Sequence, residues 1–199
     1  MYKLNFDAAT FENESGVGAV IRNAVGDVMA ALSARGAAVV DSEEAEALAC
    51  RKAMEFAIDA GFSELIVEGD NAMVMSAVSS TSPNWSRLGV IYDDIGCLAA
   101  GLRYVAFSCI RRSVNSVAHS LARYANVLDE EVVWLEDSPP PAHDAFYFDF
   151  SFLNEWSLIG LSKKNIKLNS LRTKINKLIL DETRDVKLNF NWILIFTQN

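Results

Sequence analysis

One stretch constrains the fold of this chain more than any other: a short apolar run that ends in acidic residues and leads directly into a helical pattern. The run covers residues 64–67 and is followed by Glu68 and Asp70. Apolar residues at helical spacing begin directly after Asn71. In open α/β sheets, functional groups usually lie at the carboxyl ends of strands, beside the N-terminus of the next helix. We therefore expect Asp70 at a functional edge of a sheet.

Three strand patterns precede this run. Residues 2–9 alternate between apolar and polar side chains, and Asp7 is the last polar position of the alternation. Residues 16–22 and 28–34 predict two more strands. The short connections between the three indicate an antiparallel meander.

A helix connects the meander to the apolar run. Ser42 is a suitable N-cap, and apolar residues follow it at helical spacing. Glu46 lies one step off the apolar stripe, at the border where the helix meets the sheet. Because the helix acts as a crossover, the strand after it is expected to run parallel to the first strand. Asp7 and Asp70 should then lie side by side, with Glu46 above both.

The second half of the chain adds two helices and a strand. Residues 88–98 have helical spacing, and residues 103–110 predict the fifth strand. Ser113 is expected to cap the last helix, on which Asn115 and His119 share a face. The order of elements predicts an α/β fold with a five-stranded mixed sheet, three antiparallel strands then parallel ones, flanked by helices.

Charge is distributed unevenly. Residues 1–150 hold 10 Lys/Arg and 22 Asp/Glu, whereas residues 151–199 hold 8 and 4. Affinity for nucleic acid rests largely on Lys and Arg side chains that neutralise phosphates. The acidic part is therefore a poor general binder of polyanions, and nucleic-acid binding requires a local site with metal ions.

Composition also bounds location and domain organisation. No apolar run approaches the roughly 18 residues that span a membrane, and the N-terminus lacks a signal-peptide pattern. We expect an intracellular protein, nuclear or cytoplasmic, without a membrane partner.

Three widely spaced cysteines argue against a disulfide framework or a zinc site. The packed pattern ends near residues 139–141, so we expect a domain at 1–145 and a poorly ordered extension at 146–199.

Five motifs stand in order along the first part of the chain: Lys3-Leu4-Asn5-Phe6-Asp7, Gly16 to Arg22, Glu44 to Ala49, Val67 to Asn71 and Arg112 to Ala122. Together they resemble the ribonuclease H superfamily, in particular the plant ribonuclease H-like domains related to retrotransposon reverse transcriptases. The ending at residues 133–137 also looks like that group. The resemblance covers about residues 2–145 and implies a ribonuclease H-like fold.

The resemblance implies two-metal endonucleolytic hydrolysis of the RNA strand of an RNA–DNA hybrid. By motif position, Asp7, Glu46 and Asp70 match three of the four acids of the family. They would hold two Mg²⁺ or Mn²⁺ ions, for which hard oxygen ligands are suitable. Clustered carboxylates repel one another, so they favour either protons or divalent cations.

The fourth acid is where this chain departs from the family pattern, because His119 stands where active members carry Asp. Either His119 takes part in catalysis as a weak ligand or proton shuttle, or it is a structural residue of the helix. The predicted contacts to nucleic acid are Arg112, Asn115 and Asn71. For Asn115 the alternative is an orienting or capping role, and for Arg112 it is a solvated strand end.

Some members of the family have a basic protrusion that this chain lacks. Arg87 is the only basic residue between Asp70 and Arg103. Affinity for the substrate should therefore be low and salt-dependent. Trp85, in the same segment, is expected in the core rather than stacked on a base. Three hypotheses follow: a monomeric ribonuclease, a degenerate domain that binds nucleic acid or a protein partner without cleaving, and a non-functional transposon fragment.

Overall fold

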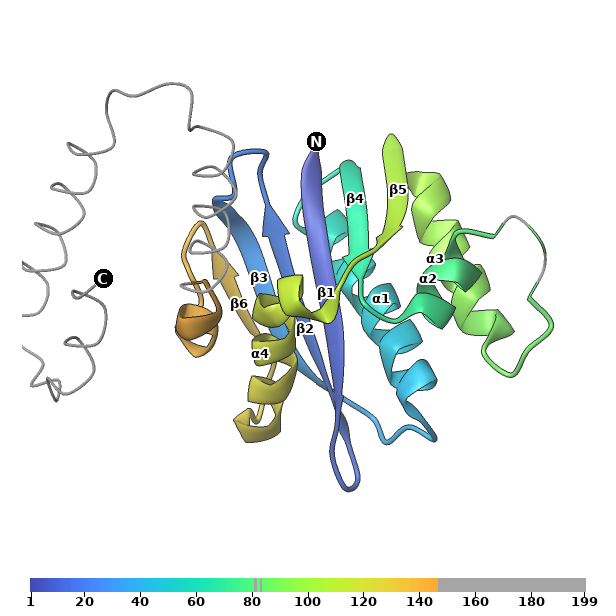
Figure 1. Cartoon of the computed structure of the whole chain (residues 1–199), viewed down its shortest axis with the longest axis horizontal. Coiled ribbons are helices and arrows are strands. Elements are labelled where there is room, and N and C mark those ends of the chain that lie inside the picture. Colours follow the sequence, from blue (N-terminus) through green and yellow to red (C-terminus); the bar gives the residue numbers. More distant parts are fainter. Residues whose placement is uncertain (81, 83, 147–199) are drawn as a thin grey trace, which may run out of the picture. The chain divides into compact units, whose positions relative to one another are not determined.

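The computed structural model describes residues 1–80, 82 and 84–146, in which a mixed sheet has helices on both faces (Figure 1). The strands are β1 (Tyr2–Thr10), β2 (Ser15–Arg22), β3 (Val28–Gly36), β4 (Glu64–Gly69), β5 (Tyr104–Cys109) and β6 (Val132–Leu135). The α-helices are α1 (Ser42–Asp59), α2 (Ala72–Val78), α3 (Gly89–Gly101) and α4 (Ser116–Tyr124). Short 3₁₀ helices are η1 (Arg112–Val114), η2 (Ala125–Val127) and η3 (Pro140–Ala142). The predicted extension at 146–199 lies, apart from its first residue, outside the described residues.

The strand order in the sheet is β5-β4-β1-β2-β3-β6. Strands β1, β2 and β3 form the predicted antiparallel meander. Strand β4 runs parallel to β1, because α1 carries the chain back across the sheet, and β5 is parallel to β4. The predicted α/β class and the mixed sheet are therefore confirmed. No helix in the described part of the chain is long and apolar enough to cross a bilayer.

The sheet has six strands in the described residues rather than the predicted five. The additional strand, β6, pairs antiparallel with β3 at the edge of the sheet. It is four residues long, and its Val133 and Leu135 are 44% and 65% exposed. So short a strand lacks the extended alternation by which the sequence predicts the others.

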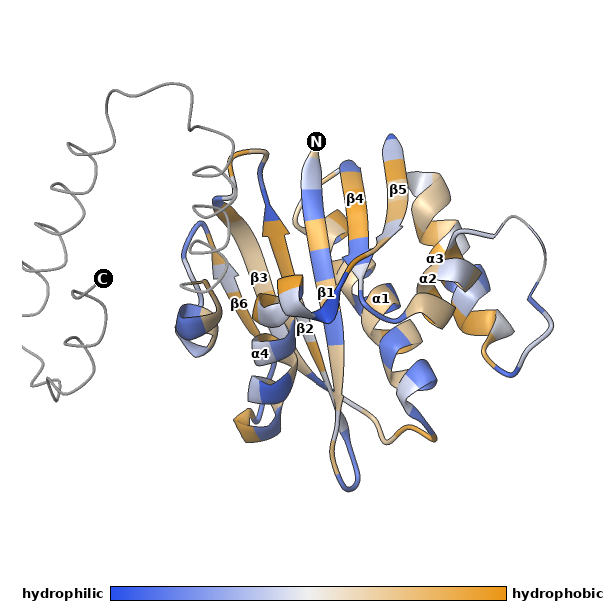
Figure 2. Ribbon diagram, in the orientation of Figure 1, coloured by the Kyte–Doolittle hydropathy of each residue, from blue (hydrophilic) through white to orange (hydrophobic). Residues whose placement is uncertain are grey.

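Side chains of the meander alternate between the two faces of the sheet, and Figure 2 shows the resulting bands of hydrophobic and hydrophilic residues along β1. Leu4 and Phe6 point into a core that α1, α2 and α3 close. Val20 and Ala31 point into a second core, on the face that α4 covers. The alternation places Asp7 on this second face, toward α4.

Helix α4 lies unusually close to β2 because Gly18 has no side chain. A Cβ atom at Gly18 would lie 2.1 Å from the carbonyl oxygen of Ala118. A second contact holds the same helix to β3, where the Ser33 hydroxyl donates a hydrogen bond to the carbonyl of Leu121 at 2.7 Å. The distance between α4 and the sheet is therefore set by the backbone contact at Gly18 and by the hydrogen bond from Ser33.

The structure shifts two predicted helix caps, the cap of α1 by one residue and the cap of α4 by two residues. Asp41, not Ser42, caps α1: its carboxylate accepts a hydrogen bond from the Glu44 amide at 2.9 Å. Asp41 has the extended backbone that a cap requires, and Ser42 is already helical. Asn115, not Ser113, directly precedes α4, because the chain first forms η1.

Trp85 was expected in the core, and this prediction is wrong. The side chain is 93% exposed in the segment between α2 and α3. A single aromatic residue outside any periodic pattern gives no helix or strand face to which it can be assigned.

The close approach of α4 to the sheet can be tested by adding one methyl group. Gly18→Ala should lower the free energy of unfolding of the full chain by about 1–3 kcal/mol, because the new Cβ meets helix backbone that cannot rotate away. The measurement is urea denaturation followed by circular dichroism.

Gly96→Ala is the matched control. Gly96 lies inside α3, and its Cβ would meet nothing within 4 Å. The substitution should raise the free energy of unfolding by about 0.5–1 kcal/mol, since alanine loses less backbone entropy in a helix. Equal stability of Gly18→Ala and the original chain would contradict the packing described.

Candidate active site

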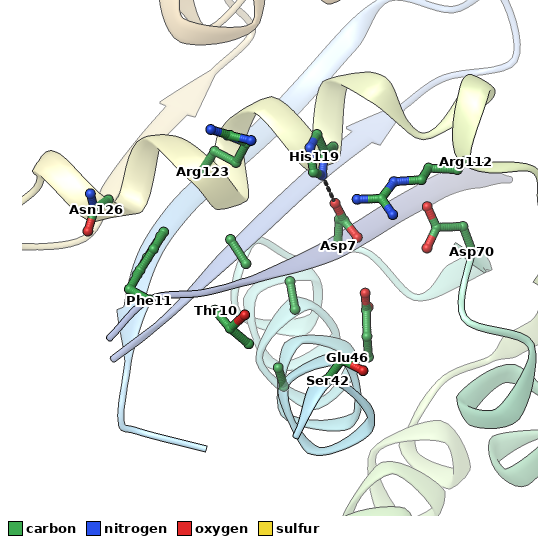
Figure 3. Close-up of a pocket in the computed structure, with 13 residues that line it drawn as sticks. Asp7, Thr10, Phe11, Ser42, Glu46, Asp70, Arg112, His119, Arg123 and Asn126 are labelled. Carbon is green, nitrogen blue, oxygen red and sulfur yellow. Dashed lines mark hydrogen bonds and ion pairs between the residues drawn. The ribbon is translucent and has the colours of Figure 1, made fainter. Parts of the chain in front are cut away.

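Three carboxylates from separate parts of the chain converge at one edge of the sheet (Figure 3). Asp7 lies in β1, and Asp70 directly follows β4. The two strands are parallel, with Asn5 opposite Glu68, so both acids reach the same edge. Glu46 joins them from the beginning of α1. Oxygen atoms of the three residues lie within 4.8 Å of one another, so the structure brings the three predicted acids together.

The spacing of Asp7 and Asp70 is supported by the residues that precede them. A Cβ atom on Gly69 would lie 2.6 Å from the ring carbon Cζ of Phe6, which is fully buried. The missing side chain at Gly69 therefore allows the end of β4 to pack directly on this ring. Asp7 and Asp70 directly follow the two residues that make this close approach.

Glu68, the other acid of the same stretch, has a different role. Its two oxygens accept hydrogen bonds from Lys3 Nζ at 2.9 Å and from Asn5 Nδ2 at 3.0 Å. These bonds compensate the charge of Glu68 on the neighbouring strand, and Glu68 is not part of the group of three.

Two buried oxygens of the cluster lack a hydrogen-bond partner within the part of the chain that the structure describes. Asp7 and Glu46 are 3% and 8% exposed. Glu46 Oε2 and Asp70 Oδ2 are buried without a hydrogen-bond partner among the described residues. A buried oxygen of this kind is destabilising unless an ion or water satisfies it. Because carboxylate oxygens are the ligands that Mg²⁺ and Mn²⁺ prefer, the residues present fit a divalent cation.

Burial and mutual repulsion change the protonation of the cluster. Burial, followed by the negative charges of Asp7 and Asp70, raises the pKa of Glu46 to about 9. Burial also raises the pKa of Asp7, although the hydrogen bond from His119 acts in the opposite direction. Without a cation, the site therefore retains a proton on Glu46 at neutral pH.

His119 contacts the cluster through Asp7. Its Nδ1 atom lies 2.6 Å from Asp7 Oδ2, and the side chain is 29% exposed. Since a carboxylate oxygen accepts, Nδ1 carries the hydrogen and donates it. The imidazole of α4 thus orients the Asp7 carboxylate, and it occupies the face of Asp7 opposite Glu46 (Figure 3).

Asn115 holds the beginning of α4 against β1. Its Nδ2 donates a hydrogen bond to the carbonyl oxygen of Phe6 at 2.8 Å, and the side chain is fully buried. Phe6 directly precedes Asp7, so the bond fixes α4 next to this acid. A buried Asn115 that is bonded to β1 suits the alternative of an orienting role better than the predicted contact with nucleic acid.

The other two predicted contacts to nucleic acid lie in different surroundings. Arg112 lines the cavity that contains the acids and is exposed. Asn71 caps α2, where its Oδ1 accepts hydrogen bonds from the amides of Met73 and Val74. Asn71 is not among the residues that line this cavity.

The cavity has a volume of about 450 Å³ and extends beyond the acids along α4. Its walls include residues that sequence reasoning missed: Thr10, Phe11, Ser42, Arg123 and Asn126. For Arg123 a signal was present, because it follows His119 by four residues and so shares its side of the helix. The others come from strand and helix ends, for which the sequence gives no common pattern.

Solved ribonuclease H domains share this fold. The ribonuclease H1 of the archaeon Halobacterium salinarum aligns with a TM-score of 0.58 over 63% of this chain and 96% of its own, at 25% identity. The N-terminal ribonuclease H domain of a Mycobacterium tuberculosis protein gives 0.56 over 62% and 91%, at 24% identity. LC11-RNase H1, solved in complex with an RNA/DNA hybrid, gives 0.56 over 63% and 96%, at 19% identity. No curated protein sequence matches the chain.

The predicted resemblance is confirmed at the level of the family. The profile of the reverse transcriptase-like family matches residues 5–125. This span is more than half of the 199 residues and includes Asp7, Glu46, Asp70 and His119. With its ribonuclease H-like fold and this match, the chain belongs to the reverse transcriptase-like family.

Proposed function

We propose that residues 1–145 form a metal-dependent endoribonuclease that cleaves the RNA strand of RNA–DNA hybrids. The observation that carries the proposal is the cluster of Asp7, Glu46 and Asp70, in which buried oxygens lack any partner among the described residues. A fold shared with a ribonuclease H1 solved on an RNA/DNA hybrid supports this choice of substrate.

Asp7, Glu46 and Asp70 would hold the cation. A bound divalent ion such as Mg²⁺ or Mn²⁺ can activate water and stabilise a leaving oxygen. The chain supplies a largely buried group of ligands for it, since Asp70 directly follows β4, Asp7 lies in β1 just beyond the residues that pair with β4, and Glu46 belongs to a packed helix. Such rigidity keeps the ligands in place during the reaction.

Other residues of the cavity would position the substrate. Arg112 and Arg123 line the same cavity as the acids and are both exposed, so each can meet a phosphate of the bound strand. They are few, and the domain is acidic overall. We therefore expect affinity for the hybrid to fall steeply as salt increases.

A second function, binding without cleavage, is favoured by one observation. The residue on α4 that contacts Asp7 is a histidine, where active members of the resembling family carry Asp. If this change abolishes hydrolysis, the domain remains a binder of nucleic acid or of a protein partner. Turnover therefore decides between the two functions.

Removal of one ligand charge tests the nuclease proposal. Asp70→Asn keeps the size of the side chain but weakens its binding of a cation, so cleavage of a labelled RNA–DNA hybrid by the full chain should fall by at least about 100-fold. Asp129→Asn, a change at an exposed acid outside the cavity, should cleave at the original rate. Cleavage by the original chain that is absent, or that Asp70→Asn leaves intact, would reject the proposal.

Competition between a proton and a cation predicts how stability depends on pH. Between the ordinary pKa of 4.5 and about 9, the folded cation-free chain keeps a proton on Glu46 that the unfolded chain has lost. Its stability therefore falls as pH rises through this window. Mg²⁺ replaces the proton, so it should raise the unfolding temperature more at about pH 8 than at about pH 6.

Glu46→Gln is the control for this measurement. The amide cannot ionise, so the variant should lose most of the Mg²⁺ effect and should not lose stability through this window on account of residue 46. A Mg²⁺ effect that is equally large in the variant would place the cation elsewhere.

A further inference from the structure

Glu46 and Asp70 lie on the side of Asp7 that faces away from His119 (Figure 3). Glu46 Oε2 and Asp70 Oδ2 are buried and have no hydrogen-bond partner in the described part of the chain. Glu46 is itself more than nine-tenths buried, and its carboxylate points toward Asp7 and Asp70 (Figure 3). One carboxylate oxygen from each of Asp7, Glu46 and Asp70 lies within 4.8 Å of the other two, which gives a single group of ligand atoms. The arrangement provides for one cation.

The other side of Asp7 is closed by a hydrogen bond. His119 Nδ1 donates to Asp7 Oδ2 at 2.6 Å, from the face opposite Glu46. The hydrogen that points at this oxygen carries partial positive charge, so a cation cannot approach along the same direction. A second ion between Asp7 and α4 would first have to displace the imidazole.

Helix α4 cannot move away to make room. Gly18 brings β2 into direct contact with the backbone of the helix at Ala118, one residue before His119. The Ser33 hydroxyl holds the carbonyl of Leu121, and Asn115 holds the carbonyl of Phe6. These contacts fix the helix backbone on both sides of His119, so the imidazole can leave Asp7 only by breaking its hydrogen bond and rotating as a side chain.

We propose that this site binds one divalent cation, on Asp7, Glu46 and Asp70, and that His119 excludes a second. The inference rests on the proposed function and deepens it, because the resemblance to ribonuclease H implies two ions. Here the imidazole takes the volume and the carboxylate oxygen that a second ion would need.

The number of bound Mn²⁺ ions tests the inference directly. Mn²⁺ is titrated into the full chain, alone and with a short RNA–DNA hybrid, and free Mn²⁺ is measured by electron paramagnetic resonance against the hybrid as a blank. The original chain should bind one ion in both conditions. His119→Asp should bind two with the hybrid present, because a fourth carboxylate then faces Asp7. His119→Asn should bind one, since its amide can still donate to Asp7.

The original chain alone decides the main claim, even if a variant fails to fold. Two ions in it, or none, would overturn the inference. A single ion in His119→Asp, with circular dichroism like that of the original chain, would show that His119 is not what excludes the second. Hybrid cleavage is measured on the same samples. Two bound ions together with cleavage would reject this inference but support the proposed nuclease. One bound ion without cleavage would support the inference and reject the nuclease.

Discussion

Repulsion among three carboxylates is the constraint on which the rest of this site depends. In a buried environment each negative charge disfavours its neighbours, so a chain holds such a group together only where other contacts supply the stability. Here the parallel pairing of β1 with β4 and the packing of α1 on the meander provide those contacts. The repulsion that remains contributes to the raised pKa of Glu46, so a cation that bound to the cluster would compete with a proton on this residue.

Helix α4 contributes to the site through its position rather than through charge. Its distance from the sheet depends on the absence of a side chain at Gly18, and its beginning is tied to β1 by Asn115. Because His119 belongs to this helix, its Nδ1 atom lies 2.6 Å from Asp7 Oδ2. Gly18, which lies opposite Asp7 in the pairing of β1 with β2, therefore also helps to determine where His119 meets this acid.

Much of this arrangement follows from local patterns in the sequence. The alternation in β1 separates Asp7 from Leu4 and Phe6, and the crossover rule brings Asp7 beside Asp70. The contact between His119 and Asp7 joins residues 112 positions apart, and it depends on how closely α4 approaches the sheet. No period in the sequence encodes that distance. The strand β6 was missed for another reason, its length of four residues, whereas Arg123 follows His119 by four residues and could have been assigned to the same side of the helix.

The packing of Gly69 on the ring of Phe6 has a consequence for the choice of ion. Asp70 and Asp7 follow these two residues, so their separation cannot widen without opening a contact between β4 and a fully buried ring. Ca²⁺ binds oxygen ligands at about 2.3–2.6 Å in a flexible coordination geometry. Mg²⁺ binds them at about 2.0–2.1 Å and requires nearly octahedral geometry. If the three acids bind a cation, as proposed, a frame that resists expansion would discriminate by ionic radius and would favour the smaller ion.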